Sequence, residues 1–160
     1  MHVRVATTAN GNDGIWASTA SLPLNEKTNV RVEAFGRDVV LFLNNSFDSK
    51  VSVSADRISG DAILYVSDPW YDPAAATIGS IQMKSLSCLS RLSNNGSASD
   101  FSGRLSKHAI IDRTIVPANF SLSFDITPFE IVSGWASIIH YSKDNSDMGS
   151  EGRIPGILFF

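Results

Sequence analysis

A two-residue alternation of apolar and polar side chains is the feature that most limits how this chain can fold. Between Asn119 and Ile126 every second residue is apolar, and the residues between are serine or aspartate. Residues 2–5 and 29–34 have the same period. Successive side chains of a β-strand point to opposite faces, so this pattern predicts strands with one buried face. Because no segment has the period of a helix of three turns, we predict an all-β protein.

Further strands are expected where short apolar runs lie between turn residues. Residues 29–44 are predicted to form a hairpin that turns at Gly36-Arg37-Asp38, and Gly79 is predicted to mark a β-bulge. The other expected strands are residues 2–5, 50–54, 62–67, 77–84, 108–116, 119–126, 135–141 and 153–160. About ten short strands joined by Gly, Asn, Asp and Pro turns are typical of an antiparallel two-sheet sandwich or jelly roll.

Residues 85–106 have a different composition from the rest of the chain. Serine dominates this segment, and it contains no Val, Ile or Thr. Ser, Gly and Asn enrichment is typical of a flexible connection, and we therefore predict a linker over these residues. The leucines at 86, 89 and 92 leave a short helical turn as the alternative.

The totals exclude several classes of protein. A chain of 160 residues with 43% hydrophobic and 18% charged residues is expected to be globular, as one domain spanning residues 1–160. A net charge of -3, without a basic cluster, gives no indication of nucleic-acid binding. No apolar run is long enough for a membrane helix. One cysteine excludes an internal disulfide. The first residues enter a strand pattern directly, so we expect no signal peptide there.

The order of the segments is also informative. Read from Lys107, the chain gives Asn119–Ile126, then Gly134–Tyr141, then 153–160 followed by 2–6. The hairpin over 29–44 and the segment 64–82 complete the series. In this order the chain resembles the concanavalin-A-like superfamily, and within it most closely the laminin-G-like domains of animal extracellular proteins. The resemblance covers nearly the whole chain except 85–106.

The resemblance implies a two-sheet jelly roll that binds glycans or protein partners, often with calcium at one rim. The strand order implies that the fold is circularly permuted, with residues 85–106 joining the original last and first strands. The alternative is that residues 1–84 and 107–160 are adjoining halves of tandem repeats. One chain closes into one sandwich if the strands at residues 1 and 160 pair as hairpin neighbours; otherwise two chains exchange halves in a domain-swapped homo-oligomer.

One candidate ligand site follows the strand expected at 62–67. In Asp68-Pro-Trp70-Tyr71-Asp72 two aromatic residues stand between two acids. Aromatic rings can stack on a sugar while carboxylates accept hydrogen bonds from its hydroxyl groups. These four residues and Arg153 are the predicted ligand-binding residues. The alternative is that Trp70 covers the edge of the core.

One candidate metal site lies in two polar loops. Calcium prefers six to eight oxygen ligands, which flexible loops can supply. We expect loops 9–14 and 142–152 to meet at one end of the sandwich. Their predicted calcium ligands are Asn10, Asn12, Asp13, Asp144, Asp147 and Glu151. The alternative is a pair of solvated turns.

Sequence signatures of catalysis are missing. There is no G-x-S-x-G, H-E-x-x-H or phosphate-loop motif, and no expected strand carries the paired acids of a sandwich-fold glycosidase. His140 is expected to be a sheet residue, and Trp135 a residue at the core edge. We therefore expect a non-catalytic, lectin-like carbohydrate-binding module of the cell surface or extracellular matrix. A protein–protein adhesion module is the alternative.

Overall fold

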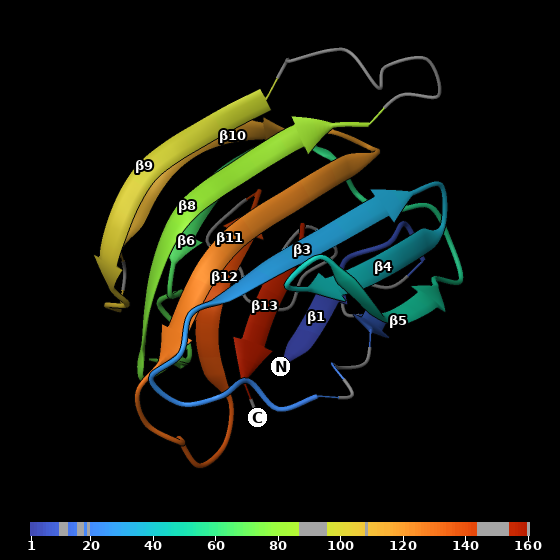
Figure 1. Cartoon of the computed structure of the whole chain (residues 1–160). Coiled ribbons are helices and arrows are strands. Elements are labelled where there is room, and N and C mark those ends of the chain that lie inside the picture. The colour runs from blue at the N-terminus through green and yellow to red at the C-terminus, as the bar shows by residue number, and fades with distance from the viewer. Residues whose placement is uncertain are drawn as a thin grey trace.

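The described part of the chain is all-β. The computed structural model describes residues 1–9, 13–15, 18, 20–86, 96–107, 109–143 and 154–159. These residues contain no helix, and their strands form two antiparallel sheets that pack face to face as a β-sandwich (Figure 1). No described segment is a helix that is long and apolar enough to cross a bilayer.

One sheet contains seven strands and the other six. The seven-stranded sheet has the order β10-β6-β12-β13-β1-β2, and the short strand β7 pairs in parallel with β12. Its strands are β1 (His2–Val5), β2 (Asp13–Ile15), β6 (Gly60–Val66), β7 (Asp72–Pro73), β10 (Ile110–Val116), β12 (Ala136–Ser142) and β13 (Gly156–Phe159).

The six-stranded sheet has the order β5-β4-β3-β11-β8-β9. Its strands are β3 (Thr28–Phe35), β4 (Asp38–Leu43), β5 (Ser46–Ser52), β8 (Ala76–Ser85), β9 (Gly96–Arg104) and β11 (Phe120–Pro128). This sheet faces the viewer in Figure 1.

The core lies between the two sheets. On β11 the apolar residues predicted to be buried are 0–2% exposed, and the residues between them are half-buried. On β3 Val30, Val32 and Ala34 face the same core. All seven residues of β12 are buried, on the outer face of the sheet as well as the inner one. The outer face of β12 is therefore covered, and part of that cover is the candidate site described below.

The first and last strands of the chain lie side by side inside the seven-stranded sheet. β1 pairs with β13 in antiparallel register, with Val3 opposite Ile157. This confirms the pairing that a closed sandwich requires of these two strands. Both strands also have another neighbour, β2 on one side and β12 on the other, so neither is at an edge.

Turn residues fix the register of neighbouring strands in the six-stranded sheet. β3 and β4 pair as predicted, from Val30 opposite Leu43 to Phe35 opposite Asp38, across a turn at Gly36-Arg37. Asn44 and Asn45 have φ of 49° and 65° between β4 and β5, and Asn is among the residues that tolerate this left-handed conformation. The bulge predicted at Gly79 lies one residue later, because the register with β9 shifts between Gly79 and Ile81, and Ser80 has φ of 55°.

The linker predicted over residues 85–106 is wrong for its second half. Gly96–Arg104 form β9, which pairs with β8 from Thr77 opposite Arg104 to Lys84 opposite Gly96. β9 is an edge strand, and a strand in this position can pair through its backbone without apolar residues on both faces. Small side chains suit the close pairing, since a Cβ on Gly79 would stand 3.3 Å from the Ser102 hydroxyl oxygen. Residues 87–95 lie outside the described part of the chain.

Candidate functional site

The predicted ligand segment begins in a sharp turn at the end of β6. Ser67 has φ of 66°, which turns the chain out of the strand. One carboxylate oxygen of Asp68, Oδ1, then accepts hydrogen bonds from the backbone amides of Trp70 and Tyr71, at 3.0 and 2.7 Å. An aspartate that binds the amides two and three residues ahead stabilises a local turn. Asp68 therefore shapes the loop from within.

The second carboxylate oxygen of Asp68 binds a histidine from another strand. The Nδ1 group of His140, on β12, donates to Asp68 Oδ2 at 2.9 Å. The two side chains are 0% and 1% exposed. Burial raises the pKa of the Asp68 carboxyl, but the hydrogen bonds from His140 and from the Tyr71 amide outweigh it, so this pKa lies below its ordinary value. A substrate cannot reach either group, so the role of the pair is structural. Its hydrogen bond joins the loop to β12 and holds the loop against the sheet.

Trp70 lies on this buried pair. Its ring centroid is 5.2 Å from that of His140 and 6.1 Å from that of Tyr65, on β6. The indole is half-buried, and it covers part of the outer face of the seven-stranded sheet. Trp70 therefore packs on Tyr65 and His140. Asp72 differs, since its side chain is 89% exposed and meets Lys107 Nζ at 3.3 Å.

Asp72 lines a polar hollow together with residues that follow β11. The hollow has a volume of about 350 Å³ and lies between the β7 strand and the loop at 129–135. Glu130 contributes an exposed carboxylate, and Trp135 contributes a half-buried aromatic side chain. The hollow therefore combines an aromatic side chain with two carboxylates.

Trp135 is held from the side of β1. The guanidinium carbon of Arg4 lies 4.6 Å from the centroid of its ring, and the His2 ring lies 4.8 Å from it, edge to face. Burial and the positive charges of the N-terminus and Arg4 lower the pKa of His2, which keeps the imidazole neutral at neutral pH. Two side chains of β1, His2 and Arg4, thus fix the orientation of this indole.

The predicted metal ligands are mostly outside the described residues. These are Asn10, Asn12, Asp144, Asp147 and Glu151, and only the backbone of Asp13 is described. The described strand ends that flank the two loops lie at one end of the sheet, since Val5 is opposite Asp13, and Arg4 is opposite Gly156. Within the described part of the chain, no group of three or more His, Cys, Asp or Glu residues could hold a metal ion.

Sequence reasoning missed two members of the site, His140 and Trp135. His140 lies 72 residues from Asp68, its hydrogen-bond partner, and no local pattern links the two. Trp135 was expected only at the core edge, whereas it also lines the hollow. Of the predicted ligand residues, Asp72 lines the hollow, whereas Asp68, Trp70 and Tyr71 lie on the loop that precedes it and do not line the hollow. Arg153 lies outside the described residues.

No match is found when the chain is compared with models of known protein families, with curated proteins and with solved structures.

Proposed function

We propose that the protein is a non-catalytic carbohydrate-binding module whose ligand occupies the hollow beside Asp72, Glu130 and Trp135. The supporting observation is the combination of groups in that hollow. Its volume of about 350 Å³ falls in the range of small-molecule sites. An aromatic ring packs against the C–H face of a sugar, and carboxylates accept strong hydrogen bonds from its hydroxyl groups.

The loop that carries Asp72 is pre-organised in this proposal. Asp68 and His140 fix the loop through buried hydrogen bonds, and Arg4 fixes Trp135 from the other side. A site whose groups are already held in place loses less conformational entropy on binding. The same segment thus has an inner part that is structural and an outer part that binds.

The proposal also includes the fold family and the order of the strands. We propose a concanavalin-A-like, laminin-G-like jelly roll with a circularly permuted strand order. What supports it is the antiparallel pairing of β1 with β13 inside the sheet. In an unpermuted fold this pair would be an ordinary hairpin. We further propose that such a module works on the cell surface or in the matrix, with calcium as a ligand of the loops that flank β2.

The test is a glycan array probed with the labelled protein. The proposal predicts selective binding that Trp135→Ala and Asp72→Asn each reduce at least tenfold, with Lys84→Gln as control. Lys84 is an exposed residue of the other sheet. Equal binding by the Trp135→Ala variant would contradict the proposed site. Hydrolysis of a bound glycan during incubation would contradict the non-catalytic role.

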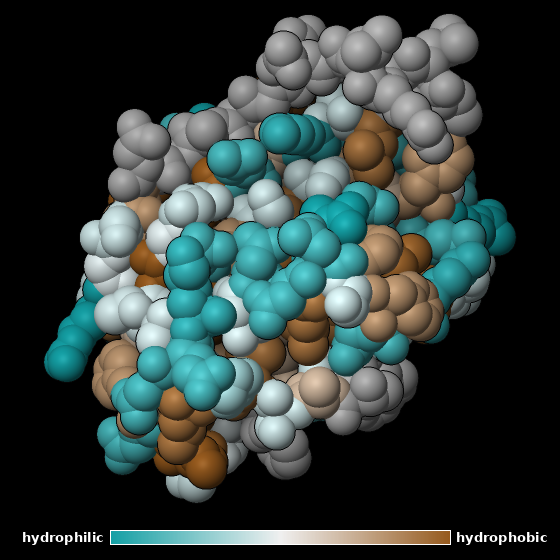
Figure 2. All heavy atoms as spheres, in the orientation of Figure 1, coloured by the Kyte–Doolittle hydropathy of each residue, from teal (hydrophilic) through white to brown (hydrophobic). Residues whose placement is uncertain are grey.

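Protein–protein adhesion is the second candidate, and an apolar surface at the same end of the molecule favours it. Ile131 is 81% exposed, and Leu24 is 42% exposed. Both line an apolar hollow of about 140 Å³, which Met1 and Phe159 also line. Figure 2 shows hydrophobic side chains at the tip where the loop between β11 and β12 lies in Figure 1. An array without any bound glycan would move this candidate to first place.

A further inference from the structure

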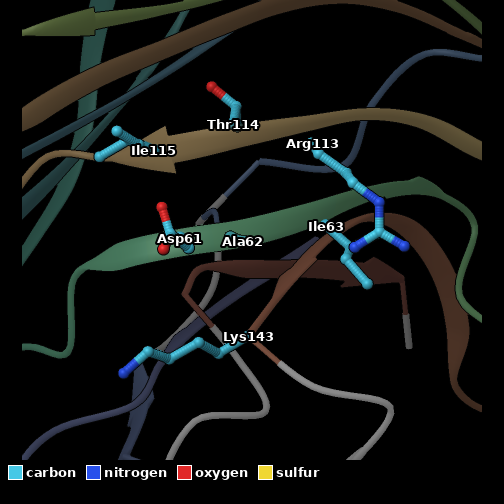
Figure 3. Close-up of a pocket in the computed structure, with 7 residues that line it drawn as sticks. All are labelled: Asp61, Ala62, Ile63, Arg113, Thr114, Ile115 and Lys143. Carbon is cyan, nitrogen blue, oxygen red and sulfur yellow. The ribbon is translucent and has the colours of Figure 1, made fainter.

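A second hollow lies on the outer face of the seven-stranded sheet, near the ends of β6, β10 and β12. Its volume is about 360 Å³, and it shares no lining residue with the Trp135 hollow (Figure 3). β6 and β10 pair there with Ile63 opposite Arg113 and Asp61 opposite Ile115. Because directly opposed residues point to the same face, these four side chains lie together on the outer surface.

The charged groups stand at separate places in this hollow. Arg113 and Asp61 are diagonal to one another across the strand pair, and such neighbours are about 7–8 Å apart. Figure 3 shows the Arg113 guanidinium at one end of the hollow, with Asp61 and Lys143 towards the other. Two isoleucines also line the hollow: Ile115, which is 66% exposed, lies opposite Asp61, and Ile63, which is 8% exposed, lies opposite Arg113.

Arg113 is available to a ligand. Its guanidinium is exposed, and within the described part of the chain no salt bridge or side-chain hydrogen bond involves it. A guanidinium binds a carboxylate through two parallel hydrogen bonds, which is a stronger and more specific arrangement than a lysine provides. The exposed carboxylate of Asp61 repels a bare anion but accepts hydrogen bonds from hydroxyl groups.

We infer that this hollow is a binding site for a sugar acid, with the carboxylate of the ligand on Arg113 and its hydroxyl groups on Asp61. The apolar side chains of Ile63 and Ile115 contact the C–H face of the ring. The hollow thus selects a hydroxylated carboxylate over both a neutral sugar and a simple inorganic anion. The site is separate from the Trp135 hollow and does not depend on it.

The test is a titration of the ¹⁵N-labelled protein with D-galacturonate, run in parallel with D-galactose. Galacturonate is expected to shift the amide signals of Asp61, Ile63, Arg113 and Ile115, whereas galactose leaves these signals in place. Arg113→Gln is expected to weaken galacturonate binding about tenfold or more, because it removes a charge-assisted hydrogen-bond pair. Lys84→Gln removes one positive charge from the other sheet and is expected to leave the affinity unchanged.

Three results would overturn the inference. One is the absence of galacturonate-induced shifts at these amides, and another is equal affinity in the Arg113→Gln variant. The third is an equal response to galactose, which shows that the carboxylate is not recognised. Binding at the Trp135 hollow is read from the amide signals of Asp72, Ser133 and Trp135. Failure of that site and failure of this one can therefore be told apart in the same spectra.

Discussion

Replacing Asp68 with alanine tests the buried pair that holds the candidate ligand loop. The wild-type carboxylate accepts one hydrogen bond from His140 and two from the backbone amides of Trp70 and Tyr71. Removing the carboxylate leaves these three buried donors without their acceptor, at about 1–3 kcal/mol for each unsatisfied group. We therefore expect Asp68→Ala to lower the free energy of unfolding by about 3 kcal/mol or more, which corresponds to a Tm shift of about 2–4 °C for each kcal/mol in a chain of this size.

Asp68→Asn removes the negative charge of the side chain but keeps its size and shape. The amide keeps one oxygen for the Trp70 and Tyr71 amides, so only the charge-assisted bond to His140 is lost, at a cost of about 1.5–3 kcal/mol. The pKa of the wild-type carboxyl is lowered in the folded state. Its stabilising contribution is therefore present above the unfolded pKa of about 3.9 and is lost as the pH falls through the folded pKa. The difference between wild type and Asp68→Asn should shrink below about pH 4.

Urea unfolding followed by tryptophan fluorescence measures both variants at neutral and acidic pH. Asp72→Asn is the matched control, since this carboxylate is 89% exposed and its bridge to Lys107 is worth about 0–1 kcal/mol. A loss of stability in Asp68→Ala no larger than that in Asp72→Asn would contradict the stabilising role of the buried pair. A penalty of Asp68→Asn that grows as the pH falls would contradict the lowered pKa of Asp68.

Three further predictions concern other parts of the molecule. Thr28→Val should raise the free energy of unfolding by about 1 kcal/mol in urea unfolding, because no described residue forms a hydrogen bond with the buried Thr28 hydroxyl; a loss of stability would contradict this. Arg57→Met should cost about 1–3 kcal/mol for each of the two backbone carbonyls that the buried guanidinium binds, while Arg37→Met, at an exposed ion pair, should cost no more than about 1 kcal/mol. Calcium in about 100-fold excess over its Kd should raise the free energy of unfolding by about 2.7 kcal/mol, and EDTA or Asp13→Asn should abolish the gain in a thermal melt; an unchanged melt would contradict the predicted calcium site.

The strands that were predicted well are those whose sequence shows the burial pattern. β11 was expected at 119–126 and spans Phe120–Pro128, because alternating apolar residues in a central strand must face the core. β9 was missed, since an edge strand of serine and glycine pairs through its backbone and leaves no apolar period. β2 and β7, with three and two residues, are too short to show any period.

Only the part of the candidate site that lies within one continuous segment could be predicted from the sequence. Asp68-Pro-Trp70-Tyr71-Asp72 is visible because its aromatic and acidic residues are adjacent. Its contacts with His140, and the hollow that Asp72 shares with Trp135, arise from strand pairing between distant segments. Pairing of this kind depends on the whole sheet, and no local pattern encodes it.

The measurement that tests the central proposal most directly is an NMR titration of the labelled protein with the glycan selected on the array, read at the tryptophan indole signals. The account predicts that the indole signal of Trp135 and the amide signals of Asp72 and Ser133 shift together, while the indole signal of Trp70, which packs on His140, stays in place. Shifts at Trp70 without Trp135, or saturating binding that moves neither, would contradict the proposed site.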